Sequence, residues 1–187
     1  MKAVYFTEHG GPEVLQYGEL PEPVANSNEV KIKVRACSLN RLDVYTRAGV
    51  RGTKMDLKEP HVLGADVSGE IVEVGSNVTK VSVGDRVVVN PRITCMQCSY
   101  CQSNQSEYCE KAGMVGSATR GGYAEFAVVP ASSVFPIPTS LSYVQAASLP
   151  TVFMPSWNIL IRRSNLKPWE IALVPSASSG VGTAAIQ

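Results

Sequence analysis

The sequence has no charge imbalance, no long apolar run and no low-complexity segment. Lys and Arg total 17 against 16 for Asp and Glu, and they are scattered, so neither nucleic acid nor an anionic membrane is expected as the main partner. No apolar run approaches the ~20 residues that span a bilayer. The amino terminus meets charge at Glu8 and lacks the apolar core of a signal peptide. We therefore expect a cytoplasmic protein with reduced thiols, and no membrane partner.

Cysteine is scarce but concentrated. Four of the five cysteines lie within residues 95–109, with gaps of two, two and seven residues. Thiolates spaced in this way can converge on one ion, and structural Zn²⁺ takes four of them tetrahedrally. Two disulfides, an iron–sulfur cluster or four unconnected thiols are the alternatives, and disulfides are disfavoured without an oxidising compartment. The spacing favours one closed, non-catalytic zinc site per chain, in a lobe spanning residues 92–112, with ligands Cys95, Cys98, Cys101 and Cys109.

Residues 1–138 show short strand patterns separated by glycine and proline turns, which is typical of a mainly β, barrel-like domain with few helices. A short helix is expected over residues 40–47, with Asn40 near its start. Cys37, the fifth cysteine, is interpreted as a small buried apolar residue. The strands are expected at residues 3–6, 14–17, 29–37, 66–75, 86–89 and 123–129.

Residues 139–187 follow a different pattern. A helix capped by Ser140 is expected over residues 140–147, and a second within 150–163, starting irregularly around Pro155. The apolar run 171–174 predicts a buried strand. A turn and the opening of another helix follow. This strand–turn–helix order predicts the first unit of an alternating α/β domain.

The turn after residue 174 is rich in small residues. Small residues between a buried strand and a helix let the backbone approach a pyrophosphate. The complete G-x-G-x-x-G pattern is absent, however, and an ordinary tight turn remains an alternative. The small residues in question are Ser178, Ser179, Gly180 and Gly182.

Several segments in order resemble one family. They are residues 40–43, 64–75, 84–87 and 121–125, together with the four-cysteine lobe and the turn ending at Gly182. The chain resembles the amino-terminal half of the medium-chain dehydrogenase/reductase superfamily, the zinc-type alcohol dehydrogenases and quinone oxidoreductases. This resemblance implies a GroES-like barrel followed by a Rossmann domain, with NAD or NADP in the cleft between them. It also implies that the cysteine lobe holds the family's structural zinc.

The departures from the family concern its second, catalytic zinc. The three ligand positions fall on Asn40, on Ala65 beside Asp66, and near Thr151. Asn, Ala and Thr supply neither thiolate nor imidazole, so no catalytic zinc site is expected. Of the two histidines, His61 lies four residues before the family's histidine ligand position at Ala65 and is interpreted as a loop residue. His9 is even farther from any ligand position.

Asn40 matches the zinc-independent quinone oxidoreductase branch. There the resemblance places this amide near the nicotinamide, so Asn40 and Tyr45 are the candidate catalytic residues, with a packed core role as the alternative for Tyr45. Asp43 is expected to brace the short helix. The implied reaction is NAD(P)H-dependent reduction of a small carbonyl, enone or quinone substrate, and a homo-oligomer remains an option. The implied cofactor-binding residues are Asn40, Thr151, Ser178, Ser179, Gly180, Val181 and Gly182.

Two alternatives stay open: a non-catalytic, zinc-stabilised GroES-like domain and a zinc-type alcohol dehydrogenase. Family members continue far beyond Gln187, so the resemblance implies a truncated form that, alone, binds dinucleotide poorly and turns over little. Without partner strands, residues 171–187 are expected to be disordered, self-associated or packed against the barrel.

Overall fold

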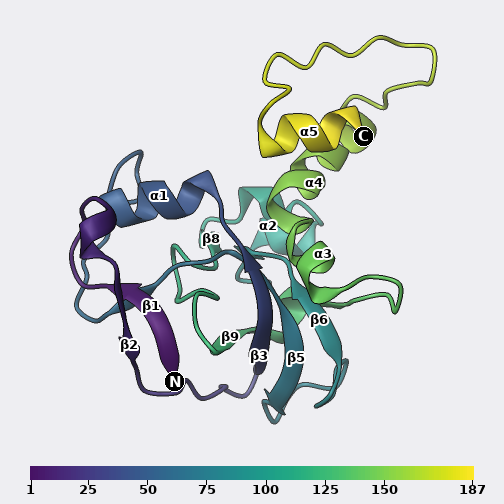
Figure 1. Cartoon of the computed structure of the whole chain (residues 1–187). Coiled ribbons are helices and arrows are strands. Elements are labelled where there is room, and N and C mark those ends of the chain that lie inside the picture. The colour runs from purple at the N-terminus through teal and green to yellow at the C-terminus, as the bar shows by residue number, and fades with distance from the viewer.

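The computed structural model describes all 187 residues, and strands dominate its first three quarters (Figure 1). The expected β-rich domain is present. The strands are β1 (Lys2–Phe6), β2 (Gln16–Glu19), β3 (Glu29–Ser38), β4 (His61–Val62), β5 (Asp66–Val74), β6 (Arg86–Val89), β7 (Arg92–Ile93), β8 (Gly113–Met114), β9 (Phe126–Pro130) and β10 (Val134–Pro136).

The helices are short. They are α1 (Arg41–Ala48), α2 (Ser99–Gln102), α3 (Tyr143–Ala147), α4 (Pro150–Trp157) and α5 (Gly180–Ile186), with 3₁₀ turns η1 (Pro12–Val14), η2 (Ser106–Tyr108) and η3 (Ala131–Ser133) and one π-helical segment, η4 (Asn158–Arg163). No helix is both long and apolar enough to cross a membrane.

The strands form three antiparallel sheets and no closed barrel. The largest sheet has the order β10-β6-β5-β3-β9, a second has β2-β1-β4, and β7 pairs with β8. The predicted barrel is therefore corrected to a set of open sheets. The core lies on one face of the largest sheet, where alternate residues of its strands are fully buried, because strand side chains point alternately to opposite faces. Its ten residues are Val30, Ile32, Val67, Ile71, Val87, Val89, Val115, Ala127, Val129 and Val134.

Some helices and strands begin at other residues than predicted, because neighbouring residues could also serve as the first residue or cap. Ser142, not Ser140, caps α3: its hydroxyl accepts from the Gln145 N–H at 3.2 Å, and the Gln145 side chain accepts in return from the Ser142 N–H at 2.9 Å. The second helix begins at Pro150, with Pro155 inside it, because proline is well tolerated in a first helical turn. The predicted strand 123–129 begins at Phe126, and the return strand 14–17 is shifted to 16–19.

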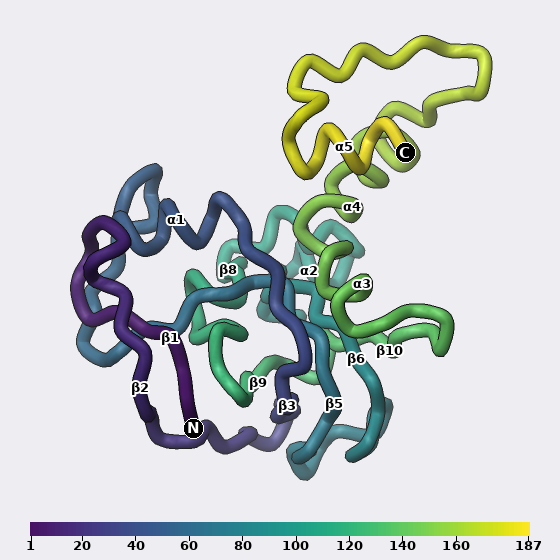
Figure 2. Tube along the Cα trace, viewed as in Figure 1, coloured from purple at the N-terminus to yellow at the C-terminus, as the bar shows by residue number.

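The predicted strand over residues 171–174 is wrong. These residues form no strand, and Ile171 and Leu173 are 97% and 88% exposed. A buried parallel strand needs neighbours on both sides, and this segment has none. It belongs to a wide loop that projects away from the sheets and returns to α5 (Figure 2). Helix α5 then packs on α4 and not on the sheets, with the Ser156 hydroxyl donating to the Val181 carbonyl at 2.8 Å.

Candidate functional site: a four-cysteine lobe and a buried carboxylate cluster

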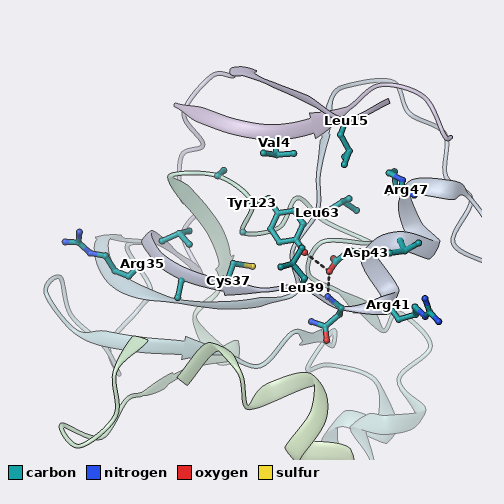
Figure 3. A pocket seen from close by; sticks show the side chains of 16 residues that line it. Val4, Leu15, Arg35, Cys37, Leu39, Arg41, Asp43, Arg47, Leu63 and Tyr123 are labelled. Atoms are coloured by element: carbon teal, nitrogen blue, oxygen red, sulfur yellow. Dashed lines mark hydrogen bonds between the residues drawn. The ribbon is translucent and has the colours of Figure 1, made fainter. Parts of the chain in front are cut away.

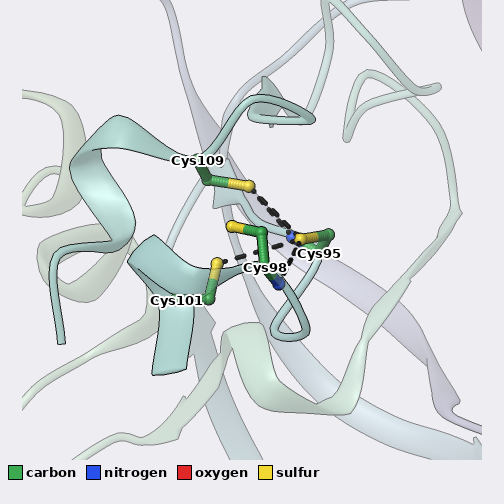
Figure 4. A group of neighbouring side chains, drawn as sticks. All are labelled: Cys95, Cys98, Cys101 and Cys109. Carbon is green, nitrogen blue, oxygen red and sulfur yellow. Dashed lines mark hydrogen bonds between the residues drawn. The ribbon is translucent and has the colours of Figure 1, made fainter. Parts of the chain in front are cut away.

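The four predicted zinc ligands come together in the structure (Figure 4). All four sulfur atoms lie within 4.8 Å of one another, with Cys95 3.6 Å from Cys109 and 3.9 Å from Cys101. Four sulfurs around a tetrahedral zinc, each about 2.3 Å from the ion, are separated by about 3.8 Å. The arrangement therefore fits a closed zinc site. Cysteine sulfurs would fill all four coordination positions, so none would be open to a substrate.

The electrostatics of this lobe favour a cation. Backbone N–H groups of Gln97 and Cys98 point at the Cys95 sulfur and lower the pKa of that thiol to about 6. Burial, followed by hydrogen bonds with neighbouring thiols, raises the pKa of Cys101 to about 11. The backbone donors thus favour a thiolate at Cys95, whereas burial disfavours one at Cys101. A divalent cation would stabilise the fully deprotonated set.

The amino-terminal ends of α1, β5 and α4 converge on the Asp66 carboxylate, and Asp66 is 1% exposed. Oδ1 accepts from the backbone N–H and the hydroxyl of Thr151, at 3.1 and 2.7 Å. Oδ2 accepts from the Asn40 amide at 2.9 Å and the Ser38 hydroxyl at 2.8 Å. We call Ser38, Asn40, Asp66 and Thr151 the carboxylate cluster. It joins two predicted site residues, Asn40 and Thr151, that lie far apart in the sequence.

Asp43 braces helix α1, as its position predicted. Its Oδ2 accepts from the Asn40 backbone N–H at 2.7 Å and from the Tyr123 hydroxyl at 2.8 Å (Figure 3), and its Oδ1 accepts from the Gly64 N–H at 3.1 Å. Gly64 has φ +101°, and a Cβ there would lie 2.6 Å from the Tyr123 ring. The brace therefore requires glycine at 64 and an aromatic hydroxyl at 123.

Replacing Tyr123 by phenylalanine is expected to lower the free energy of unfolding by about 1.5–3 kcal/mol, because hydrogen bonds to charged groups are worth about this much. The buried Asp43 oxygen would lose one of its two donors. Urea unfolding of the two proteins measures the difference. A matched control is Tyr17→Phe, since Tyr17 is 71% exposed and should change stability very little. Equal stability of the Tyr123 variant and the wild type would contradict the bracing role.

A cavity of about 760 Å³ opens beside the carboxylate cluster and is lined mainly by apolar side chains (Figure 3). Asn40 and Asp43 contribute from α1 and its start, and Tyr123 from the segment before β9. Apolar pockets with a few converging polar groups are the usual sites for small molecules. The cavity could therefore hold a small, largely apolar organic molecule next to Asn40.

The other predicted catalytic residue, Tyr45, is not among the residues that line this cavity. The Arg51 guanidinium stands over its ring, 4.7 Å from the centroid, and its carbonyl accepts from the Thr53 hydroxyl at 2.7 Å. Cys37 lines the cavity and is half-buried. Burial, together with the negative charges of Asp43 and Asp66, raises the pKa of the Cys37 thiol well above its ordinary value, so this thiol is poorly reactive.

The small-residue turn packs against α4. Ser179 caps α5 by accepting from the Gly182 N–H at 3.0 Å. A Cβ on Gly180 would lie 2.6 Å from Val152, and one on Gly182 would lie 2.0 Å from the Ser176 carbonyl oxygen. The glycines at these two positions therefore permit a close helix–turn contact. Thr151 and Val152 are adjacent in sequence, so α4 touches both the carboxylate cluster and this turn.

His61 lies in strand β4 and not in the loop that the sequence predicted, because this strand pairs with β1. Its Nε2 lies 3.2 Å from the Gly116 carbonyl, and its ring meets Phe6 edge-on at a centroid distance of 5.6 Å. Burial, with the positive charge of Arg120, lowers the pKa of His61 below its usual value. Its nitrogens meet no other metal ligand, since the cysteine lobe is the only such cluster.

His61 should make stability depend on pH. Because its folded pKa is lowered, the unfolded chain binds the proton more readily, so the neutral folded form is most stable above about pH 6.5 and loses stability as the pH falls below that value. Urea unfolding at pH 7.5 and pH 5.5 measures the loss, and His61→Phe removes the component due to this residue. An equal pH dependence in wild type and variant would contradict this assignment.

Two residues of the site were missed by sequence reasoning. Ser38 and Tyr123 donate to the buried carboxylates. Ser38 lies outside the family-like segments, and Tyr123 lies within residues 121–125, but nothing in that segment indicates its partner. Asp66 was noted only as the neighbour of Ala65; the structure shows that its carboxylate is buried and therefore needs donors.

Comparisons with known proteins agree with this geometry. Residues 26–139 match the model of the alcohol dehydrogenase GroES-like domain. The mouse quinone oxidoreductase is 34% identical over 188 residues, covering 100% of this chain and 48% of that protein. The NAD-dependent alcohol dehydrogenase of Saccharolobus solfataricus is 33% identical over 192 residues, covering 100% of this chain and 54% of that protein.

Solved structures of alcohol dehydrogenases have a similar fold. A cobalt- and zinc-bound thermostable alcohol dehydrogenase from Pyrobaculum aerophilum matches with a TM-score of 0.89 and 34% identity, covering 100% of this chain and 54% of that one. The chain spans about half the length of the curated relatives it matches. From its fold, its cysteine lobe and these matches, the chain belongs to the medium-chain dehydrogenase/reductase superfamily and carries its alcohol dehydrogenase GroES-like domain.

Proposed function

We propose that this protein is an NAD(P)H-dependent oxidoreductase of the quinone oxidoreductase and alcohol dehydrogenase type, which transfers hydride without a catalytic metal. The observation that supports this most is the carboxylate cluster. Asn40 and Thr151 stand at two positions that correspond to catalytic zinc ligands in the family's zinc-type members. Both donate hydrogen bonds to the Asp66 carboxylate, which is buried and finds all its partners among hydrogen-bond donors of the protein. Such a cluster contains no thiolate or imidazole for zinc.

The cysteine lobe is the proposed place of the one metal ion. Zn²⁺ held by Cys95, Cys98, Cys101 and Cys109 would order residues 92–112, which contain little regular structure of their own. The lobe contacts the rest of the molecule through Ile93, which packs against the core, and through the Glu107 carboxylate, which pairs with Arg163 of η4 at 2.9 Å. The zinc would thus support the fold without touching a substrate.

Residues near the cavity would position the reactants. The nicotinamide supplies the hydride chemistry when bound. Asn40 would lie against it or the substrate, and the apolar cavity would hold the body of a carbonyl, enone or quinone compound. Tyr45 remains a proposed contact to either. Thr151 and the turn Ser178–Ser179–Gly180–Val181–Gly182 would face the dinucleotide, with residues 1–138 as the substrate domain and 139–187 opening the cofactor domain.

The second candidate is a zinc-stabilised domain without catalysis. One observation favours it: residues 171–174 form no strand, so the turn that follows them is not held against a sheet as a pyrophosphate-binding turn requires. For this reason the 187 residues by themselves are expected to bind dinucleotide only weakly and to turn over little.

The test is a fluorescence titration with NADH and NADPH, followed by assays with a quinone, an enone and an aldehyde. Saturable binding with oxidation of NAD(P)H by any of these acceptors would support the oxidoreductase. Binding of neither dinucleotide at millimolar concentration would contradict the cofactor assignment and favour the non-catalytic domain. Tyr17→Phe, at an exposed site, is the matched control, and Asn40→Ala should reduce turnover.

A further inference from the structure

The cavity of about 760 Å³ combines a mainly apolar lining with an excess of positive charge. Its charged lining residues are Arg35, Arg41, Arg47 and Asp43. Asp43 is buried, and its two carboxylate oxygens already accept three hydrogen bonds from the protein. The lining therefore contains no acidic side chain that is free to neutralise the arginines.

The three arginines differ in where their side chains lie. Arg35 pairs with Glu70 at 3.3 Å. Figure 3 shows Arg35 and Arg41 extending away from the cavity on opposite sides, and both residues are exposed. Arg47, in contrast, is half-buried and lies on the same side of the cavity as Leu15. Since burial disfavours an unpaired charge, Arg47 is the arginine that gains most from an anionic partner.

Two hydrogen bonds with Gly10 hold Arg47 in place. Its Nε–H donates to the Gly10 carbonyl at 3.2 Å, and the Gly10 N–H donates to the Arg47 carbonyl at 3.1 Å. The guanidinium thus reaches from α1 to the segment that leads, through η1, to Leu15 at the edge of the cavity. Its two terminal NH₂ groups make no hydrogen bond or ion pair within the protein. The Glu13 carboxylate, which lies near Gly10, accepts instead from the Gly11 N–H at 2.7 Å.

We propose that the cavity binds an apolar monocarboxylate, with Arg47 receiving the carboxylate and the apolar lining enclosing the rest of the molecule. A guanidinium offers its N–H groups as a planar fork that matches the two oxygens of a carboxylate. One fixed, half-buried arginine beside apolar side chains fits a single negative charge better than a polyanion. The inference rests on the proposed function in one respect, since it names a class of compound for the cavity that is assigned there to the body of the substrate.

The experiment compares octanoate with methyl octanoate in titrations of the wild type followed by NMR, without any dinucleotide. The two compounds share one apolar chain, and only octanoate is charged. Octanoate should bind about 10-fold more tightly, the worth of a hydrogen bond to a charged group. It should shift the methyl signals of Val4, Leu15 and Val44, which line the cavity. Equal or tighter binding of the ester, or shifts confined to the exposed Trp157 and Trp169, would overturn the proposal.

Variants of Arg47 test its role, and the wild-type comparison stands even where a variant fails to fold. Arg47→Met keeps an unbranched side chain but removes the charge, and it should lose the preference for octanoate. Arg47→Lys keeps the charge without the fork and should retain part of it. Arg41→Met is the matched control, because Arg41 is an exposed arginine of the same helix that also lines the cavity. An unchanged preference in Arg47→Met, or an equal loss in Arg41→Met, would overturn the assignment.

These measurements do not use turnover. An inactive protein that prefers octanoate would contradict the proposed oxidoreductase and support the carboxylate site. A protein that oxidises NAD(P)H with neutral acceptors but binds the ester as tightly as octanoate would support the oxidoreductase and overturn the carboxylate site.

Discussion

Replacing Cys109 by serine is expected to abolish zinc binding and to unfold the segment 92–112. Cys109 is the most buried of the four ligands, and its sulfur lies 3.6 Å from that of Cys95. Structural zinc contributes on the order of 10 kcal/mol of apparent binding free energy, which is also folding free energy. Losing one of four thiolates should therefore remove most of the order in a lobe that has few regular elements.

Limited proteolysis and zinc analysis measure this effect. Cleavage is expected first within residues 92–112 of the variant, at sites that the zinc-loaded wild type protects. Cys37→Ser is the matched control, since Cys37 is the one cysteine outside the lobe and should leave the zinc content unchanged. A Cys109→Ser protein with full zinc content and wild-type protease resistance would contradict the structural role of the site.

Replacing Asp66 by alanine is expected to have the second-largest effect, a loss of about 3–5 kcal/mol in the free energy of unfolding. Four hydrogen bonds end on this buried carboxylate, and its removal leaves the Asn40 amide and the Thr151 N–H without their partner. Buried donors left unsatisfied cost about 1–3 kcal/mol each. The end of β3, the start of α1 and the start of α4 should all loosen.

Urea unfolding of Asp66→Ala measures the loss, with Glu70→Ala as the control on the same strand. Glu70 is partly exposed and pairs with Arg35 at 3.3 Å, and an exposed pair of this kind is worth less than about 1 kcal/mol. Similar losses in the two variants would contradict the special position of Asp66.

The sequence predicted the parts of this structure that depend on local patterns. Alternation of charged and apolar residues in 29–37 identified β3, because a strand with one buried face must alternate. The spacing of the four cysteines correctly predicted that their sulfur atoms come together, because these atoms come from one short, turn-rich segment. Asn40 was correctly placed at the start of α1.

The parts that depend on distant contacts were not predicted. Residues 171–174 have the composition of a buried strand, yet a strand forms only where neighbours supply its hydrogen bonds. The carboxylate cluster joins Asp66 to Thr151, 85 residues later, and no local pattern reports such a contact. The barrel-like domain was confirmed only as a set of open sheets for a similar reason, since closure depends on how the outermost strands pair.

The zinc assignment is tested most directly by the ratio of metal to protein, measured by elemental analysis of the purified wild type and of Cys109→Ser. One zinc per chain is expected in the wild type and none in the variant, because the cysteine lobe is the only cluster of at least three metal-ligating side chains and Asn40, Ala65 and Thr151 supply no ligands. Two zinc ions per wild-type chain, or one retained in Cys109→Ser, would contradict it.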